Sequence, residues 1–197
     1  MVARKDELTE LDAAIGDGDL GLTMTKGFGA VSEALAGFGE TDVGKILSKA
    51  GATLAAAAPS TMGTLLATGL LRAGQAVLGR AGLDLAGLAQ MLEAFVEGIS
   101  ARGKAKPGDK TILDSLYPAL EALRGACEQQ LSLVDGVAAA YQAAVQGLAA
   151  TKEMVSQHGK AACFGERTLG RQDPGATVGA YICEALLATV QDGEGLG

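Results

Sequence analysis

The chain is organised around one acidic, glycine-rich stretch, which reads Leu11-Asp12-Ala13-Ala14-Ile15-Gly16-Asp17-Gly18-Asp19-Leu20-Gly21. An apolar-periodic run precedes it and predicts a first helix over residues 5–14, with Asp12 at its end. Asp and Gly are poor residues for a helix interior, so Asp17 and Asp19 are expected on a tight loop just beyond that helix.

Three carboxylates that converge repel one another unless a cation holds them. Carboxylate oxygens are hard ligands that suit Mg²⁺ or Ca²⁺, so Asp12, Asp17 and Asp19 are candidate metal ligands. A calcium EF-hand is excluded, because its ligand spacing and closing Glu are absent. The spacing alone leaves a second interpretation open, in which the stretch is a solvated acidic turn or a helix cap.

Composition favours a single all-α domain over residues 1–197. The sequence is 48% hydrophobic but only 4% aromatic, without Trp and with 29 Gly. Small aliphatic residues with few β-branched ones favour closely packed helices over sheets. A length of 197 residues suffices for one hydrophobic core.

The net charge of −7 argues against a nucleic-acid partner, which needs a basic surface. The charged N-terminus does not look like a signal peptide, and the apolar stretch 51–71 is interrupted by Pro59, so we expect a cytoplasmic protein without a membrane partner. Cys127, Cys163 and Cys183 are well separated and form no CxxC pair, which predicts buried, reduced thiols and no zinc site.

Periodicity and cap residues predict about eight antiparallel helices and no strand. After the first helix, the second predicted helix covers residues 22–36, and the third is capped by Thr41 or Asp42 and ends near residue 57. The fourth covers residues 64–78, and Asp84 caps the fifth. The last three cover residues 111–130, 132–154 and 175–190. Leu113, Leu116, Leu120 and Leu123 are expected to face inward. A long irregular loop is expected over residues 157–174, and the final Gly-Leu-Gly is expected to fray.

Four loops break strong helices, at residues 16–21, 59–63, 103–109 and 159–175. Pro59-Ser60-Thr61-Met62-Gly63 opens a helix, where backbone N–H groups and hydroxyls bind phosphate; plain helix capping by Ser60 or Thr61 is the alternative. His158 is a candidate general base or an unremarkable loop residue. Basic side chains that can offset phosphate charge, or merely be solvated, are Lys104, Lys106, Lys110, Lys160, Arg167 and Arg171. A metal site, a helix N-terminus and cations together suit phosphoryl transfer, although no P-loop or kinase motif is present.

Three long motifs, in order, resemble the nucleotide-binding L subunit of dihydroxyacetone (glycerone) kinases. They are residues 11–19, Lys106-Pro107-Gly108-Asp109-Lys110-Thr111-Ile112-Leu113-Asp114, and Gly165-Glu166-Arg167-Thr168-Leu169-Gly170-Arg171-Gln172-Asp173-Pro174-Gly175-Ala176. The resemblance implies a closed barrel of eight helices that binds ADP or ATP with two Mg²⁺ ions. It also implies a substrate-binding K-type partner subunit that holds the ketose, and in some members a phosphotransferase-system protein as phosphoryl donor.

The resemblance assigns roles to particular residues. Asp12, Asp17 and Asp19 would carry the metals. Nucleotide contacts would come from Leu20, Gly21, Leu22 and Thr23, from Ser60, Thr61, Met62 and Gly63, and from Gly103, Ile112, Lys160, Asp173, Pro174 and Gly175. No catalytic residue is assigned on this chain, because the sugar-holding histidine belongs to the K-type subunit.

The sequence departs from the family pattern at several of these positions. Leu20 stands where the family usually has His, Pro59-Ser60-Thr61-Met62-Gly63 replaces a Gly-Gly-Thr-Ser-Gly type of loop, and Lys160 replaces an Arg. The matching motifs make a phosphotransferase subunit the leading hypothesis. The alternatives are a nucleotide-binding regulatory subunit without turnover, and a helical metal-binding interaction protein. Within the leading hypothesis, ATP exchanges freely or bound ADP is rephosphorylated in place.

Overall fold

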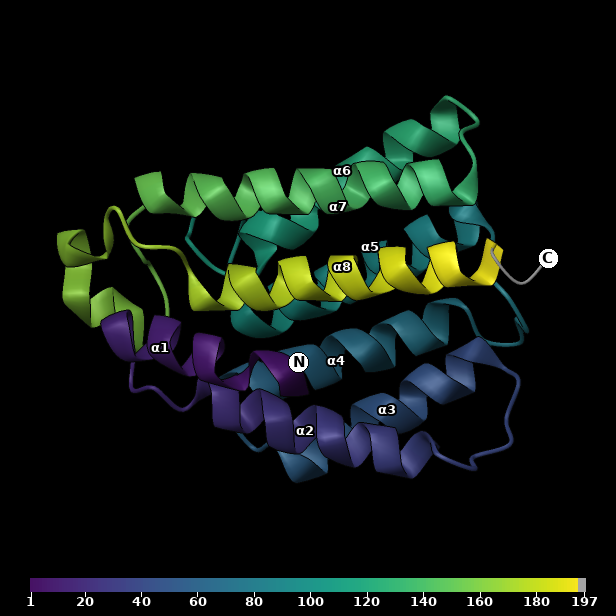
Figure 1. The fold of residues 1–197 in the computed structure, drawn as a ribbon, viewed down its shortest axis with the longest axis horizontal. Helices are drawn as coiled ribbons and strands as arrows, with labels where there is room; N and C mark the ends of the chain where they lie inside the picture. Colours follow the sequence, from purple (N-terminus) through teal and green to yellow (C-terminus); the bar gives the residue numbers. More distant parts are fainter. Residues whose placement is uncertain (195–197) are drawn as a thin grey trace. The chain divides into compact units, whose positions relative to one another are not determined.

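The computed structural model describes residues 1–194, which form helices joined by loops and contain no strand (Figure 1). The predicted all-α class is therefore confirmed. The α-helices are α1 (Lys5–Ile15), α2 (Leu20–Leu35), α3 (Val43–Ala57), α4 (Thr61–Ala76), α5 (Leu85–Gly103), α6 (Leu113–Glu128), α7 (Leu133–Ala150) and α8 (Pro174–Glu194). Three short 3-10 helices accompany them, namely η1 (Val2–Arg4), η2 (Thr151–Glu153) and η3 (Lys160–Thr168).

The helices gather into two compact units. The first unit comprises residues 1–83 and 90–105, and the second comprises residues 84–89 and the chain from Lys106 onward. Helix α5 contributes its first residues to the second unit and the rest to the first. The predicted extent of a single domain, residues 1–197, stays a prediction, and the predicted fraying of the last three residues lies outside the described part of the chain.

Helices α3 and α5 begin at side-chain caps that the sequence indicated. The Asp42 carboxylate accepts hydrogen bonds from the N–H groups of Gly44 and Lys45, at 2.8 and 3.3 Å, so Asp42 rather than Thr41 caps α3. The Asp84 carboxylate accepts from Gly87 N–H at 2.8 Å and caps α5. These caps satisfy N–H groups that have no partner inside the helix.

Several helix boundaries differ from the predicted ones. Helix α2 begins at Leu20 rather than at residue 22, and α4 begins at Thr61 rather than at residue 64. Helix α8 starts at Pro174, whose fixed φ suits a first helical position, and it extends beyond the predicted end at residue 190. The loop expected over residues 157–174 contains η3, which is kinked at Gly165, where φ is 53°.

In the first unit, small residues let helices approach closely. A Cβ atom added to Gly44 of α3 would lie 2.4 Å from the carbonyl oxygen of Gly74 in α4, and one added to Gly74 would lie 2.6 Å from the carbonyl oxygen of Gly44. No side chain fits between these two backbones. Leu8, Met24 and Leu54, which are 0% exposed, fill the core of this unit. The close packing inferred from the composition is thus observed.

In the second unit, α6 packs against α7 and α8. The four leucines predicted to face inward, Leu113, Leu116, Leu120 and Leu123, are 0–2% exposed. Pro118 lies inside α6, where it has no N–H to donate to the carbonyl of Asp114 four residues earlier. Gly147 of α7 lies against that carbonyl: an added Cβ would be 2.0 Å from Asp114 O and 3.0 Å from Pro118 Cγ.

Gly147→Ala is expected to destabilise the protein by about 2 kcal/mol, because the new methyl group meets backbone that cannot rotate away. Gly125→Ala in α6 is the matched control, since its Cβ would meet only the end of the Gln129 side chain, at 3.9 Å. That change is expected to be neutral or stabilising by about 0.5 kcal/mol. Urea unfolding of both variants measures the difference, and equal stabilities would contradict the close packing of α7 on α6.

Candidate functional site

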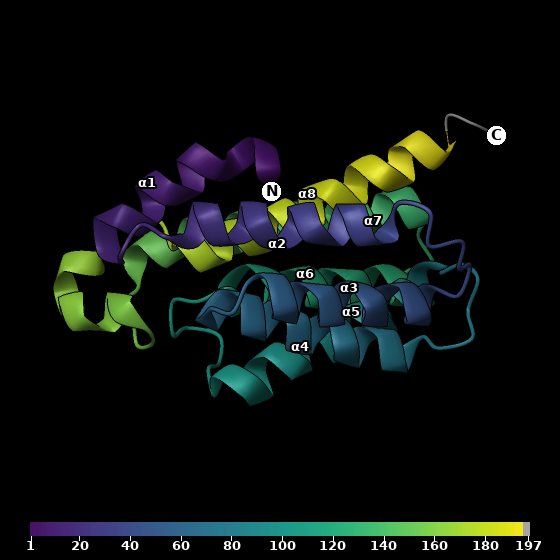
Figure 2. The same cartoon turned by 90° about the horizontal axis from the view of Figure 1, so that it is seen from below.

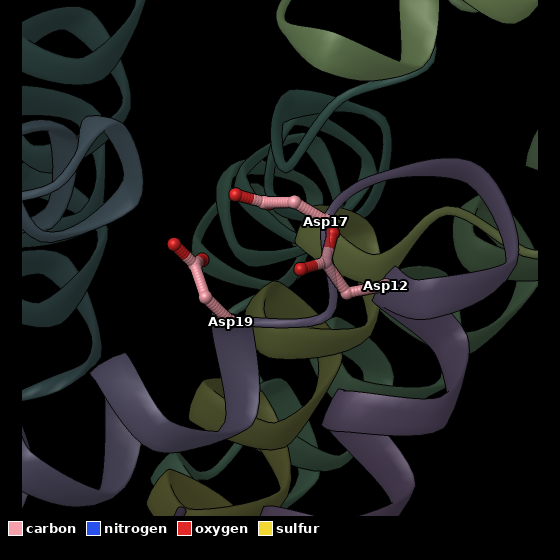
Figure 3. Close-up of side chains that lie close together, drawn as sticks. All are labelled: Asp12, Asp17 and Asp19. Carbon is pink, nitrogen blue, oxygen red and sulfur yellow. The ribbon is translucent and has the colours of Figure 1, made fainter.

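Three carboxylates of the first unit converge at the junction of α1 and α2. Asp12 lies in the last turn of α1, and Asp17 and Asp19 lie on the loop that joins α1 to α2. One oxygen from each side chain lies within 4.8 Å of the other two, and the three side chains border a common space (Figure 3). The predicted positions of all three residues are confirmed.

Local sequence builds this cluster through its glycines. A Cβ atom on Gly16 would lie 2.2 Å from Asp12 Oδ1, so only glycine leaves room for that carboxylate. Gly18 has φ of +76°, a left-handed conformation that glycine adopts readily. The other oxygen of Asp12, Oδ2, accepts a hydrogen bond from Leu20 N–H at 3.1 Å, which joins the end of α1 to the first residue of α2.

The cluster fits a divalent cation of the oxygen-preferring kind. Mg²⁺ binds oxygen ligands at about 2.1 Å, which places neighbouring ligands about 3 Å apart and opposite ligands about 4.2 Å apart. Oxygens that already lie within 4.8 Å of one another can therefore reach a shared cation by side-chain rotation. Asp17 and Asp19 are exposed and Asp12 is half-buried, so an ion and its water ligands can reach them. Neighbouring carboxylates without a cation repel one another, which makes cation binding favourable.

The loop at residues 59–63 and Gly103, both named from the sequence, lie at the same end of the first unit as the start of α2. The first half of α2 lies against the end of α3, because a Cβ on Gly27 would be 2.5 Å from Leu54 Cδ1 and 3.1 Å from Ala58 Cβ. The chain turns directly from Ala58 into α4. Gly103, at the end of α5, lies beside Leu65 in the first turns of α4, because a Cβ added to Gly103 would be 3.2 Å from Leu65 Cδ2. The N-termini of α2 and α4 and the C-terminus of α5 therefore share one end.

At the start of α4 the hydroxyl of Ser60 accepts a hydrogen bond from Gly63 N–H at 3.0 Å. This is the capping alternative considered for Ser60, and it is confirmed for that side chain. Gly63 is required by the turn, since an added Cβ would lie 1.9 Å from the carbonyl oxygen of Ala58. Thr61 is exposed and Met62 is half-buried. The exposed hydroxyl of Thr61 is the side chain of this loop that can meet a ligand most directly.

The first turn of α2 offers mainly backbone and hydroxyl groups to a ligand. The side chain of Leu20 is 6% exposed and belongs to the core, whereas that of Leu22 is 59% exposed. Gly21 is buried against α1, and Thr23 is half-buried. Helix α1 lies beside α2 in both views of the fold (Figures 1 and 2). Contacts between these four residues and a phosphate stay a prediction.

The remaining predicted nucleotide residues after Gly103 belong to the second unit. Ile112 is 2% exposed and lies against α8, where a Cβ added to Gly179 would be 3.2 Å from Ile112 Cγ1. Lys160 is exposed at the start of η3. Asp173, Pro174 and Gly175 form the buried N-terminus of α8, and the Asp173 carboxylate accepts a hydrogen bond from Ala176 N–H at 2.7 Å.

Burial raises the pKa of Asp173 to about 7. The bond from Ala176 N–H and the charge of Lys110 oppose this rise, while the charge of Asp114 adds to it. The Asp114 carboxylate itself accepts hydrogen bonds from the N–H groups of Gly108 and Thr111, at 2.5 and 2.6 Å. The buried N-terminus of α8 therefore holds a carboxyl group that takes up a proton near neutral pH.

Asp173 is expected to make the stability of the protein depend on pH. Between about pH 4 and pH 7 the folded carboxyl is protonated while the unfolded one is ionised, so stability falls as pH rises and levels off above pH 7. The loss approaches about 1.4 kcal/mol per pH unit. Asp173→Asn keeps a cap for α8 and removes the titration. Urea unfolding at pH 5 and pH 8 checks this, and an equal loss in wild type and variant would contradict it.

Two side chains raised as functional candidates have partners that the sequence did not indicate. Lys110 is 2% exposed, so its ammonium is not available to offset phosphate charge. His158 Nε2 lies 2.9 Å from Asp109 Oδ2. The pKa of Asp109 is lowered mainly by the hydrogen bond from the N–H of Lys106, and to a smaller extent by the hydrogen bond with His158.

All three cysteines are free thiols, but the prediction that they are buried holds only for Cys183. Cys163 is exposed, because it lies on η3 rather than in a core helix.

Known proteins share this sequence pattern and arrangement of helices. The family described as "DAK2 domain" matches residues 14–188. The chain belongs to the DAK2 domain family. It is 40% identical over 185 residues to the PEP-dependent dihydroxyacetone kinase, ADP-binding subunit DhaL, of Escherichia coli, with 94% of this chain and 88% of that protein covered. It is 35% identical over 185 residues to the corresponding subunit of kinase 1 from Listeria innocua, covering 94% of this chain and 87% of the relative.

Solved structures agree with this family. The dihydroxyacetone kinase of C. freundii superposes with a TM-score of 0.73 at 25% identity over 95% of this chain. The same kinase in complex with AMP-PNP and Mg²⁺ superposes with a TM-score of 0.70. This chain spans about a third of that longer kinase, 32% and 31% in the two structures. Within residues 1–194, no helix combines the length and the apolarity needed to cross a membrane.

Proposed function

We propose that this chain is the ADP/ATP- and Mg²⁺-binding subunit of a dihydroxyacetone kinase-type phosphotransferase. The convergence of Asp12, Asp17 and Asp19 to within 4.8 Å carries the proposal, because the family relation alone does not show that this chain keeps a metal site. Relatives named as ADP-binding subunits and the kinase solved with AMP-PNP and Mg²⁺ support it.

In this proposal the three aspartates hold two Mg²⁺ ions. When bound, the ions supply positive charge to the phosphate oxygens, which phosphoryl transfer requires. The N-termini of α2 and α4 point main-chain N–H groups toward the phosphates, a favourable arrangement for anions. The Thr61 hydroxyl adds a donor there, and Lys160 offsets negative charge. Ile112, Gly103 and the segment Asp173-Pro174-Gly175 contact the nucleoside.

The acceptor in this proposal is dihydroxyacetone or a related hydroxyketone or polyol held on a K-type partner subunit. The single histidine of this chain, His158, is paired with Asp109, and a sugar-holding histidine on another protein is consistent with that pairing. Relatives named as PEP-dependent or PTS-dependent kinases support a phosphotransferase-system protein as phosphoryl donor. A relative named as D-erythrulose kinase, 36% identical, supports a related ketose as an alternative acceptor.

The second candidate is a nucleotide-binding regulatory subunit without turnover. It is favoured by Leu20, which stands directly after the acidic cluster where the family usually has a histidine. Its side chain is buried, 6% exposed, so it offers no polar group to the phosphates.

Calorimetric titration of ADP and ATP, with and without Mg²⁺, tests the nucleotide site. Sub-millimolar binding that requires Mg²⁺ is the expected result, and no binding in either case would refute both candidates. Mixing the chain with a K-type subunit and dihydroxyacetone then separates the two. Ketone-dependent consumption of ATP, or of phosphoenolpyruvate through a phosphotransferase system, is expected for the kinase, and tight binding without turnover for the regulatory subunit.

A further inference from the structure

Lys110 is a buried lysine whose ammonium group is fully engaged by main-chain carbonyl oxygens. Its side chain is 2% exposed. The Nζ atom donates hydrogen bonds to the carbonyl oxygens of Met154 at 3.1 Å, Thr168 at 2.5 Å and Arg171 at 2.8 Å. An ammonium group has three N–H donors, so these three acceptors use all of them.

The charge of Lys110 is held in place by its surroundings. Burial lowers the pKa of Lys110, and the nearby Asp173 carboxyl opposes that effect. A neutral amine has two N–H donors, so only the charged form can donate to three carbonyls at once. Because a buried charge without partners is strongly unfavourable, the three carbonyls must stay in place around the ammonium. The lysine and the segment that surrounds it therefore fix one another.

The three carbonyls belong to the segment that connects α7 to α8, residues 151–173. This segment contains the 3-10 helices η2 and η3 and irregular chain but no α-helix, and it extends beyond the ends of α7 and α8 (Figures 1 and 2). Cross-links such as those to Lys110 therefore help to fix its path. Asp109, the residue before Lys110, also contacts this segment. Its carbonyl oxygen accepts a hydrogen bond from Gln157 N–H at 3.1 Å, and the Asp109 carboxylate pairs with His158 Nε2 at 2.9 Å.

We propose that Lys110 is a positioning residue for nucleotide binding. Its ammonium fixes the 151–173 segment, which carries Lys160 and leads into Asp173-Pro174-Gly175, without touching the nucleotide itself. The inference rests on the proposed function for the nucleotide and on the geometry above for the segment. It assigns Lys110 a role different from that of a phosphate-binding cation.

The test compares Lys110→Met with Lys152→Met, a control that removes an exposed lysine from the same segment. Lys110→Met leaves three carbonyls without their donor. We expect faster amide hydrogen exchange confined to residues 151–173 and an affinity for Mg²⁺–ADP weakened by about tenfold or more, as for residues that orient a binding group. Binding of Mg²⁺ alone, at the acidic cluster, is expected to stay unchanged. Lys152→Met is expected to match the wild type in every measurement.

Chemical rescue distinguishes the effect of the ammonium group from the effect of side-chain volume. Lys110→Cys in a background without Cys127, Cys163 and Cys183, treated with 2-bromoethylamine, carries a lysine analogue of nearly the same length. Restored exchange protection and restored Mg²⁺–ADP affinity are expected after the treatment. No recovery of either would overturn the role of the ammonium.

Other outcomes also decide the inference. Wild-type exchange and affinity in a folded Lys110→Met protein would overturn it. If that variant does not fold, Lys110→Gln makes the same comparison, because its amide keeps two of the three N–H donors in a neutral group; wild-type exchange and affinity in Lys110→Gln would then overturn it. Failure of the wild type to bind Mg²⁺–ADP would refute the proposed function instead, while the exchange data still test whether Lys110 fixes the segment.

Discussion

Asp17→Asn is expected to abolish Mg²⁺-dependent nucleotide binding and to leave the helical fold intact. The substitution keeps the size of the side chain but removes one of three negative charges whose oxygens lie within 4.8 Å of one another. An amide oxygen is a weaker ligand for Mg²⁺ than a carboxylate. We expect a loss of at least about a hundredfold in affinity for Mg²⁺–ADP, since changes to groups around metal ligands already weaken sites by about tenfold to a hundredfold.

Asp6→Asn is the matched control, because it makes the same change of charge at an exposed position in the first turn of α1. Calorimetry should show wild-type binding for Asp6→Asn, and circular dichroism should show equal helix content for all three proteins. An unchanged affinity in Asp17→Asn would mean that the cluster is the solvated acidic turn considered from the sequence. Equal losses in both variants would point to net charge rather than to a metal site.

The acidic cluster could be predicted from the sequence because its chemistry is local. Asp12, Asp17 and Asp19 lie within one helical turn and one tight loop, and the glycines between them show that the helix must end there. The start of α2 was predicted less well, because its first N–H is satisfied by Asp12, eight residues earlier, rather than by a cap next to it. The residues around Leu22 do not indicate that bond, so they do not show where the helix begins.

Lys110 shows where a single sequence carries too little information. It lies in a polar loop with Lys104 and Lys106, and nothing in that composition separates the buried lysine from its exposed neighbours. The three carbonyl oxygens that accept its hydrogen bonds lie 44, 58 and 61 residues further along the chain. Main-chain acceptors are present at every residue, so no side-chain pattern marks them. The 3-10 helix η3 was missed for a related reason, since its last residue, Thr168, is bonded to the distant Lys110 ammonium and no local pattern marks that bond.

The family resemblance supplied what the local patterns left open. Capping by Ser60 and phosphate binding at the start of α4 are compatible readings of one loop, because the Ser60 hydroxyl meets Gly63 N–H while the exposed Thr61 hydroxyl remains at the surface. The buried N-terminus of α8 was indicated as a nucleoside contact only by the motif that includes Asp173. The raised pKa of that carboxyl is a consequence of burial, which the sequence around it does not display.

Gly21→Ala is expected to damage stability and metal binding together. An added Cβ would lie 2.1 Å from the carbonyl oxygen of Lys5 and 2.2 Å from the Thr9 hydroxyl, both in α1. The carbonyl belongs to a helix backbone, so α1 must move away from α2 to admit the methyl group. We expect a loss of about 3 kcal/mol in stability, at the upper end for overpacking. Because α1 carries Asp12 and α2 follows Asp19, the same movement separates the ligands and weakens Mg²⁺ binding.

Gly29→Ala in the same helix is the control, since a Cβ there would meet nothing within 4 Å. It is expected to be neutral or stabilising by about 0.5–1 kcal/mol, as for glycine to alanine in a helix, with Mg²⁺ binding unchanged. Urea unfolding and Mg²⁺ titration of both variants make the comparison. If Gly21→Ala is destabilised but binds Mg²⁺ as the wild type does, the α1–α2 contact supports the fold without setting the geometry of the cluster. If it is neither destabilised nor impaired, the close approach of the two helices at Gly21 is contradicted.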